Sequence, residues 1–89
     1  MDTIVATAKR MIDIGNKEGL MEYYASILET YDPDSLDFPY LFRHIYVHAC
    51  LRKQVAIVAW LKEMYETMDP IMKIGLRQIF GYGEHLLRK

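Results

Sequence analysis

The chain of 89 residues has room for one domain, and its 52% hydrophobic and 26% charged residues are typical of a folded globular domain. Its single cysteine excludes an internal disulfide, and no apolar run approaches the ~20 residues that cross a bilayer. The net charge of −1 conceals an asymmetry, because residues 1–40 hold three Lys/Arg and eight Asp/Glu whereas residues 41–89 hold eight and four.

Helical periodicity begins at the N-terminus. In residues 3–15 the apolar side chains recur at intervals of three and four, which predicts a helix with one buried face. Gly15 suits a left-handed stop, and Asn16 suits the N-cap of a second helix. On this second helix one face carries the apolar residues Leu20, Met21, Tyr24, Ile27, Leu28 and Tyr31.

A loop separates the second helix from a third. Residues 32–39 contain three aspartates and two prolines, a composition typical of a turn segment. Pro39 suits the first turn of a helix, so we expect the third helix near 39–51. The apolar phase then predicts a fourth helix near 54–68.

A fifth helix follows at the C-terminal end. Asp69 and Pro70 predict its N-cap and first residue, and we expect it to end near Gly81, with one or two further turns over 84–88. No period-two alternation competes with the helical pattern, so the predicted class is all-α.

An internal repeat links two of the predicted loops. Residues 27–33 align with residues 64–70 at an offset of 37, and the apolar positions of the preceding helices align at the same offset. A helix pair that recurs at this interval indicates a helical solenoid. The alternative is an irregular helical bundle in which the similarity between the two segments is a coincidence.

Residues 48–61 resemble an ankyrin repeat. The resemblance depends on Ala49-Cys50 and on Ile57-Val58-Ala59-Trp60-Leu61, and the Trp-Leu ending is similar to the divergent repeats abundant in large DNA viruses. Lys53 stands where the family has its turn glycine. The length of the chain predicts one domain, residues 1–89. The repeat and the resemblance, which covers about residues 40–87, imply that it is a short solenoid of stacked antiparallel helix pairs with five to six helices and no clear β-hairpin fingers. Its units would span about 3–33, 38–69 and 70–88.

The sequence contains no recognisable set of catalytic groups. His44 and His48 have the i, i+4 spacing of a metal pair, but Cys50 falls on another side of the same predicted helix. Gly-rich phosphate loops and nucleophile motifs are missing from the sequence as well. We therefore expect no enzyme activity, no cofactor and no metal.

The ankyrin-like resemblance implies a non-catalytic protein–protein interaction module, with a partner that contacts the turns and first helices. We expect the protein to be intracellular and cytoplasmic, in the host cytoplasm if it is viral, and to have no membrane partner, because the N-terminus lacks a signal-peptide pattern. The predicted partner-binding residues are Asp34, Asp37, Phe38, Tyr40, Arg43, His44 and Val47.

Two other functions remain open. The fifth helix is apolar on nearly all sides, so Leu76 and Phe80 are candidates for an exposed self-association surface, either in a homodimer or in a structural protein such as a virion component. Binding of nucleic acid is the weaker alternative, because the acidic N-terminal half opposes it. Its candidate residues are Arg43, Arg52, Lys53, Lys73, Arg77, Arg88 and Lys89.

Overall fold

The structure of the protein, a computed structural model, describes residues 2–32 and 34–88, and these residues form six α-helices and no strand. The prediction of an all-α chain is confirmed for this part of the sequence. In chain order the helices are α1 (Asp2–Asp13), α2 (Lys17–Thr30), α3 (Phe38–Leu51), α4 (Val55–Glu66), α5 (Pro70–Leu76) and α6 (Gln78–Arg88).

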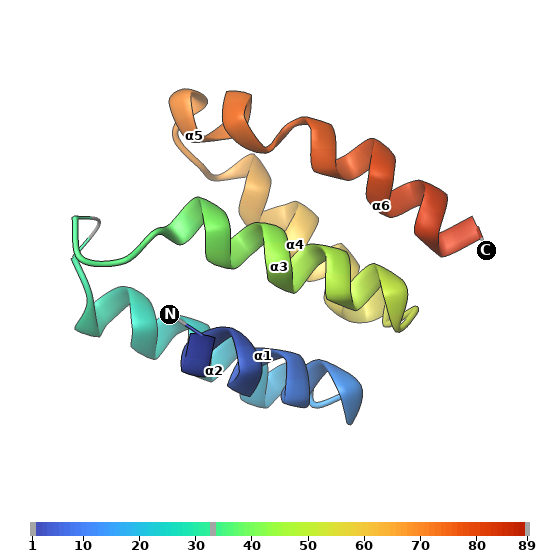
Figure 1. Cartoon of the computed structure of the whole chain (residues 1–89), viewed down its shortest axis with the longest axis horizontal. Helices are drawn as coiled ribbons and strands as arrows, with labels where there is room; N and C mark the ends of the chain where they lie inside the picture. The colour runs from blue at the N-terminus through green and yellow to red at the C-terminus, as the bar shows by residue number, and fades with distance from the viewer. Residues whose placement is uncertain (1, 33, 89) are drawn as a thin grey trace.

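The helix α3 lies at the centre of the molecule. It contacts α1, α4, α5 and α6, and Figure 1 shows it in green between the blue α1 and the red α6. Its sequence carries apolar residues on most faces, which suits a helix covered by several neighbours. The buried side chains of α3 are Phe38, Leu41, Phe42, Ile45, Tyr46, Ala49 and Cys50. Around them the other helices form a compact all-α globule with one core.

Three of the helices have a short polar side chain at the N-cap position. Asn16 and Asp69 cap α2 and α5 as predicted, and each accepts a hydrogen bond from a backbone N–H at 3.0 Å. Asp37 caps α3 in the same way, accepting from the backbone N–H of Tyr40 at 3.1 Å. These contacts satisfy N–H groups that have no partner inside the helix.

The pairs α1–α2 and α3–α4 are joined by the same type of turn. One residue in each turn has a left-handed backbone, Gly15 with φ 70° and Lys53 with φ 55°. The next residue, Asn16 or Gln54, donates its backbone N–H to the carbonyl five positions earlier, which closes the helix C-terminus. The side-chain amide of Gln54 also donates to the carbonyl of Ile12 at 3.0 Å, so the two turns are tied together.

The predicted fifth helix is divided into two. We expected one helix from Pro70 to near Gly81, but α5 ends at Leu76 and α6 begins at Gln78. Between the first two predicted units the first helices α1 and α3 meet, whereas in the third unit it is the second helix, α6, that lies along α3. The residues of α6 that are buried are Ile79, Gly83 and Leu86.

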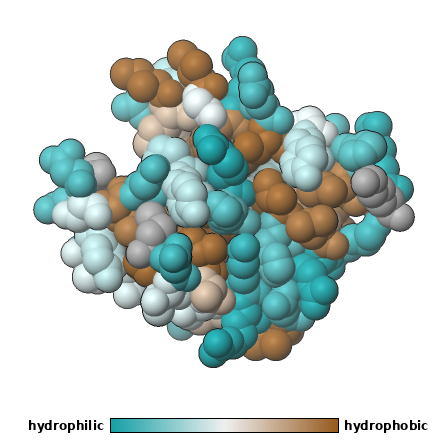
Figure 2. Space-filling model, viewed as in Figure 1, coloured by the Kyte–Doolittle hydropathy of each residue, from teal (hydrophilic) through white to brown (hydrophobic). Residues whose placement is uncertain are grey.

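The exposed apolar surface of this region differs from the expectation. Leu76 is fully buried, and Phe80 is partly buried with its ring centroid 4.4 Å from that of Tyr65. Side chains are spaced by about 100° around a helix, so burial of Leu76 turns Ile71 and Ile74 away from the core. These two are 80% and 74% exposed, and Figure 2 shows apolar atoms at the top of the molecule over α5. The prediction that Leu76 is exposed is therefore wrong.

Candidate partner-binding groove

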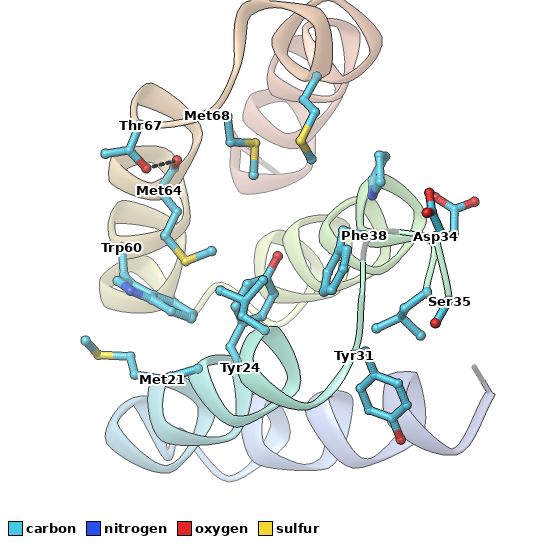
Figure 3. Close-up of a pocket in the computed structure, with 16 residues that line it drawn as sticks. Met21, Tyr24, Tyr31, Asp34, Ser35, Phe38, Trp60, Met64, Thr67 and Met68 are labelled. Atoms are coloured by element: carbon cyan, nitrogen blue, oxygen red, sulfur yellow. Dashed lines mark hydrogen bonds between the residues drawn. The ribbon is translucent and has the colours of Figure 1, made fainter.

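An open groove of about 950 Å³ lies between α2 and α4. These helices pack against α1 and α3 respectively rather than closely against each other, and the space between them is lined by side chains from both. The segment that leads into α3, and α5, also contribute to the lining. In Figure 3 the α4 side carries Trp60 and Met64, the α2 side carries Met21 and Tyr24, and the far edge carries Asp34 and Ser35.

Aromatic side chains form the base of this groove. The rings of Tyr24 and Trp60 meet edge to face, with centroids 6.0 Å apart, and Phe38 is buried close by in the same lining. Burial raises the pKa of Tyr24 to about 12, so its hydroxyl stays neutral well above physiological pH. The base is therefore an uncharged, rigid surface, of the kind that supplies large contact area in protein interfaces.

Methionines supply much of the wall. Four of the six methionines of the chain line the groove, on α2, at the end of α4 and on α5. Their unbranched, polarizable side chains adapt to irregular apolar shapes, and such residues are common on protein-binding surfaces. The four residues are Met21, Met64, Met68 and Met72. This groove thus combines a rigid aromatic base with adaptable sides.

One edge of the groove is acidic. Asp34 and Asp37 belong to the lining, and both residues are exposed. The whole stretch of residues 18–42, which includes most of α2 and the loop after it, contains six Asp/Glu and no Lys or Arg. An apolar ligand with basic groups at its margin would match this distribution of charge.

The predicted partner-binding residues fall into two groups. Asp34, Asp37 and Phe38 line the groove, as a candidate site requires. The other four residues lie on α3 outside the groove lining, where the rings of Tyr40 and His44 are in contact at a tilt of 46°, with centroids 4.3 Å apart. Of the remaining two, Arg43 is exposed and Val47 packs partly buried against the core.

Several groove residues were not predicted as part of a site. The apolar face expected on the second helix contains Met21, Leu28 and Tyr31, which are 38%, 52% and 40% exposed and face the groove rather than the core. The available signal was the width of this face, because it exceeds what one neighbouring helix covers. Trp60 and Met64 gave no such signal, since their positions in the sequence fit a core equally well.

Neither candidate histidine belongs to a metal cluster. Within residues 2–32 and 34–88, no three His, Cys, Asp or Glu side chains come close enough together to hold a metal ion. His48 instead contacts Asp13 of α1, with Nε2 2.7 Å from Oδ1, and the Arg52 guanidinium lies 2.9 Å from the same oxygen. The hydrogen bond from His48, followed by the charges of His48 and Arg52, holds the pKa of Asp13 below its usual value.

Several basic residues of the C-terminal half make polar contacts within the described part of the chain. Arg52, Lys73 and Arg88 each lie within 4.0 Å of a different carboxylate, on Asp13, Glu66 and Glu84. The Lys53 ammonium donates to a backbone carbonyl at the end of α6. Of the other candidates, Arg43 and Arg77 lie on separate helices or junctions, and Lys89 lies outside the described residues.

The chain matches no family model, no curated protein and no solved structure. None of the helices in the described residues has both the length and the apolar composition that a bilayer crossing requires.

Proposed function

We propose that the protein is a non-catalytic binding module, built of ankyrin-like helix pairs, that takes an apolar helical segment of a partner protein into the groove between α2 and α4. The observation that carries this proposal is the open, methionine-lined groove of about 950 Å³ with an acidic edge. A monomeric protein gains nothing in stability by leaving such a surface uncovered, and exposed apolar surfaces of this kind are typical of interaction sites.

The chemistry of the groove favours an amphipathic helix as the ligand. A groove between two helices accepts the apolar face of a third, with anchor side chains at i, i+3, i+4 and i+7. Methionines let the walls adjust to different anchors. The carboxylates of Asp34 and Asp37 favour Lys or Arg beside those anchors, which would raise the association rate and orient the helix.

Trp60 provides a direct test, because it is the single tryptophan of the chain and lines the groove. The probe is a synthetic amphipathic peptide of leucine and lysine that contains no tryptophan. We expect saturable changes in the intensity and wavelength of Trp60 emission on titration. A matched peptide with glutamate in place of lysine should bind at least tenfold more weakly, because the groove edge repels it.

Two leucines of equal exposure serve as variant and control. Leu28 lines the groove and is 52% exposed, whereas Leu51 is 54% exposed at the end of α3 and lies outside it. Leu28→Lys should weaken peptide binding at least tenfold, and Leu51→Lys should leave it unchanged. Absence of saturable binding, or equal loss in both variants, would overturn the proposal. Far-UV circular dichroism checks that both variants remain folded.

A further inference from the structure

We propose that the partner which occupies the groove is a second copy of this chain, and that α5 of that copy inserts Ile71 and Ile74 between α2 and α4. This inference rests on the proposed function of the groove, and it adds the identity of the ligand. The two isoleucines are the most exposed of the large hydrophobic side chains in the described residues, at 80% and 74%.

The shape of α5 suits it to act as an apolar anchor. Ile71 and Ile74 are three positions apart on a helix of seven residues, so both project on the same side of it. Leu76 on another side is fully buried and Met68 and Met72 pack against the core, which fixes the helix on its own copy. The exposed pair is therefore presented by an anchored helix rather than by a free segment.

The charges of the two surfaces are complementary. The groove edge belongs to the stretch of residues 18–42, with six Asp/Glu and no Lys or Arg. Residues 70–89 hold four Lys/Arg and one Asp/Glu, and the sequence places Lys73 and Arg77 beside the two isoleucines. Lys73 lies 3.7 Å from Glu66 on its own copy, whereas Arg77 is exposed and forms no ion pair with any residue that the structure describes. Arg77 is thus available to a carboxylate of another copy.

The position of α5 favours a closed pair of copies. Met72 of α5 lines the groove of its own copy, so the helix that carries the anchor adjoins the groove. Surfaces that adjoin can meet their counterparts across a two-fold axis, with each α5 in the groove of the other copy. A contact made by a helix of about 10 Å is small, which predicts a weak, concentration-dependent dimer.

Sedimentation velocity over a range from low micromolar to near-millimolar protein tests this arrangement. The mean mass of the wild-type protein should rise from 10.5 kDa toward twice that value. Two kinds of variant should stay monomeric over the same range: Ile71→Glu with Ile74→Glu, which changes the anchor, and Leu28→Lys, which changes the groove. Leu51→Lys is the matched control and should associate like the wild type.

A mixture of the two monomeric variants gives a further readout. The isoleucine variant keeps an intact groove, and Leu28→Lys keeps an intact anchor, so the anchor of one can bind the groove of the other. The mixture should therefore have a higher mean mass than either variant alone. Arg77→Glu should weaken the wild-type association at least threefold, and added salt should weaken it as well.

The outcomes separate this inference from the function on which it rests. If the wild-type protein stays monomeric near millimolar concentration while the leucine–lysine peptide still binds, the groove has another partner. The proposal that a second copy occupies it is then overturned. Association that survives Leu28→Lys also overturns it, because the copies would then meet elsewhere. Loss of both peptide binding and association overturns both proposals.

Discussion

Gly83 of α6 lies directly against the ring of Tyr46 in α3. A Cβ atom at this position would overlap the Tyr46 ring, and it would lie 2.9 Å from the Cys50 sulfur. The two helices approach each other this closely because glycine has no side chain to hold them apart. Gly83 is therefore required by packing, at the place where α6 covers the centre of the core.

Gly83→Ala should lower the free energy of unfolding by about 1–3 kcal/mol, which is the usual cost of overpacking a core. Gly81→Ala is the matched control, since a Cβ at Gly81 meets nothing within 4 Å. On the same helix it should raise stability by about 0.5–1 kcal/mol, the difference in helix propensity between glycine and alanine. Urea denaturation followed by circular dichroism measures both, and changes of the same sign would contradict the packing described for α6.

Tyr46→Phe should not destabilise the protein. The hydroxyl of Tyr46 is buried without a well-formed hydrogen bond in the part of the chain that the structure describes, and burial, followed by the neighbouring Cys50 thiol, raises its pKa. A buried hydroxyl without a partner costs about 1–3 kcal/mol, so its removal should be neutral or stabilising by up to ~1 kcal/mol.

The comparison for this substitution is Tyr65→Phe. The Tyr65 hydroxyl donates to the backbone carbonyl of Lys73 at 3.2 Å, so its removal should cost about 0.5–1.5 kcal/mol. Thermal unfolding measures both variants. The melting temperature of Tyr65→Phe should fall below that of the wild type, and the melting temperature of Tyr46→Phe should stay the same or rise. A larger loss in Tyr46→Phe than in Tyr65→Phe would mean that the Tyr46 hydroxyl has a partner.

Asp13→Asn should reduce stability at neutral pH and have little effect in strong acid. The hydrogen bond from His48, followed by the charges of His48 and Arg52, lowers the pKa of the Asp13 carboxylate from its ordinary value of 3.8. A carboxylate whose pKa is lower in the folded state than in the unfolded state stabilises the fold. This stability is fully present above the pKa of the unfolded state and is lost as the pH falls through the pKa of the folded state.

The stability that the wild type has over Asp13→Asn should therefore be present above about pH 4 and shrink as the pH falls further. Urea denaturation at each pH gives this profile. Asp2→Asn is the control at the other end of the same helix, and it should show no such contribution from His48 and Arg52. A gap that persists unchanged to pH 2 would rule out the ionic contact as the cause.

Lys53→Gly should stabilise the protein by about 1 kcal/mol, because a residue with a Cβ pays this penalty in the left-handed conformation. The loss of the exposed contact from its ammonium to Leu87, at 3.4 Å, subtracts little from this gain. Lys62→Gly, within α4, should instead destabilise by a similar amount. Melting temperatures that fall in both variants would show that the turn at Lys53 is not strained.

The helix ends were predictable because local chemistry determines them. Asn16 and Asp69 offer side-chain oxygens to the first free N–H groups of a helix, and Gly15 adopts the left-handed backbone without strain. The break after Leu76 has no such local marker. It depends on α6 lying along α3, a contact between residues far apart in the sequence.

The groove was not predictable for a related reason. The apolar face of α2 shows in the sequence, but the sequence does not say that α4 stands away from it. Leu28 and Ile27 are adjacent and equally apolar, yet Ile27 is 3% exposed and Leu28 is 52% exposed. Whether Leu28 is covered as well as Ile27 depends on the distance between the two helix pairs, and helix periodicity contains no information on that distance.

The central position of α3 predicts an order in which the backbone opens to solvent. Four of the other five helices pack on α3, so its amide protons should exchange with deuterium only when the whole molecule unfolds. The helix α2 packs mainly on α1, with the Tyr24–Trp60 contact to α4 beside it, so fewer contacts have to break to release α2 than to expose α3. Hydrogen exchange in α2 should therefore be faster than in α3, and its rate would measure how often the helix that forms one wall of the groove opens locally.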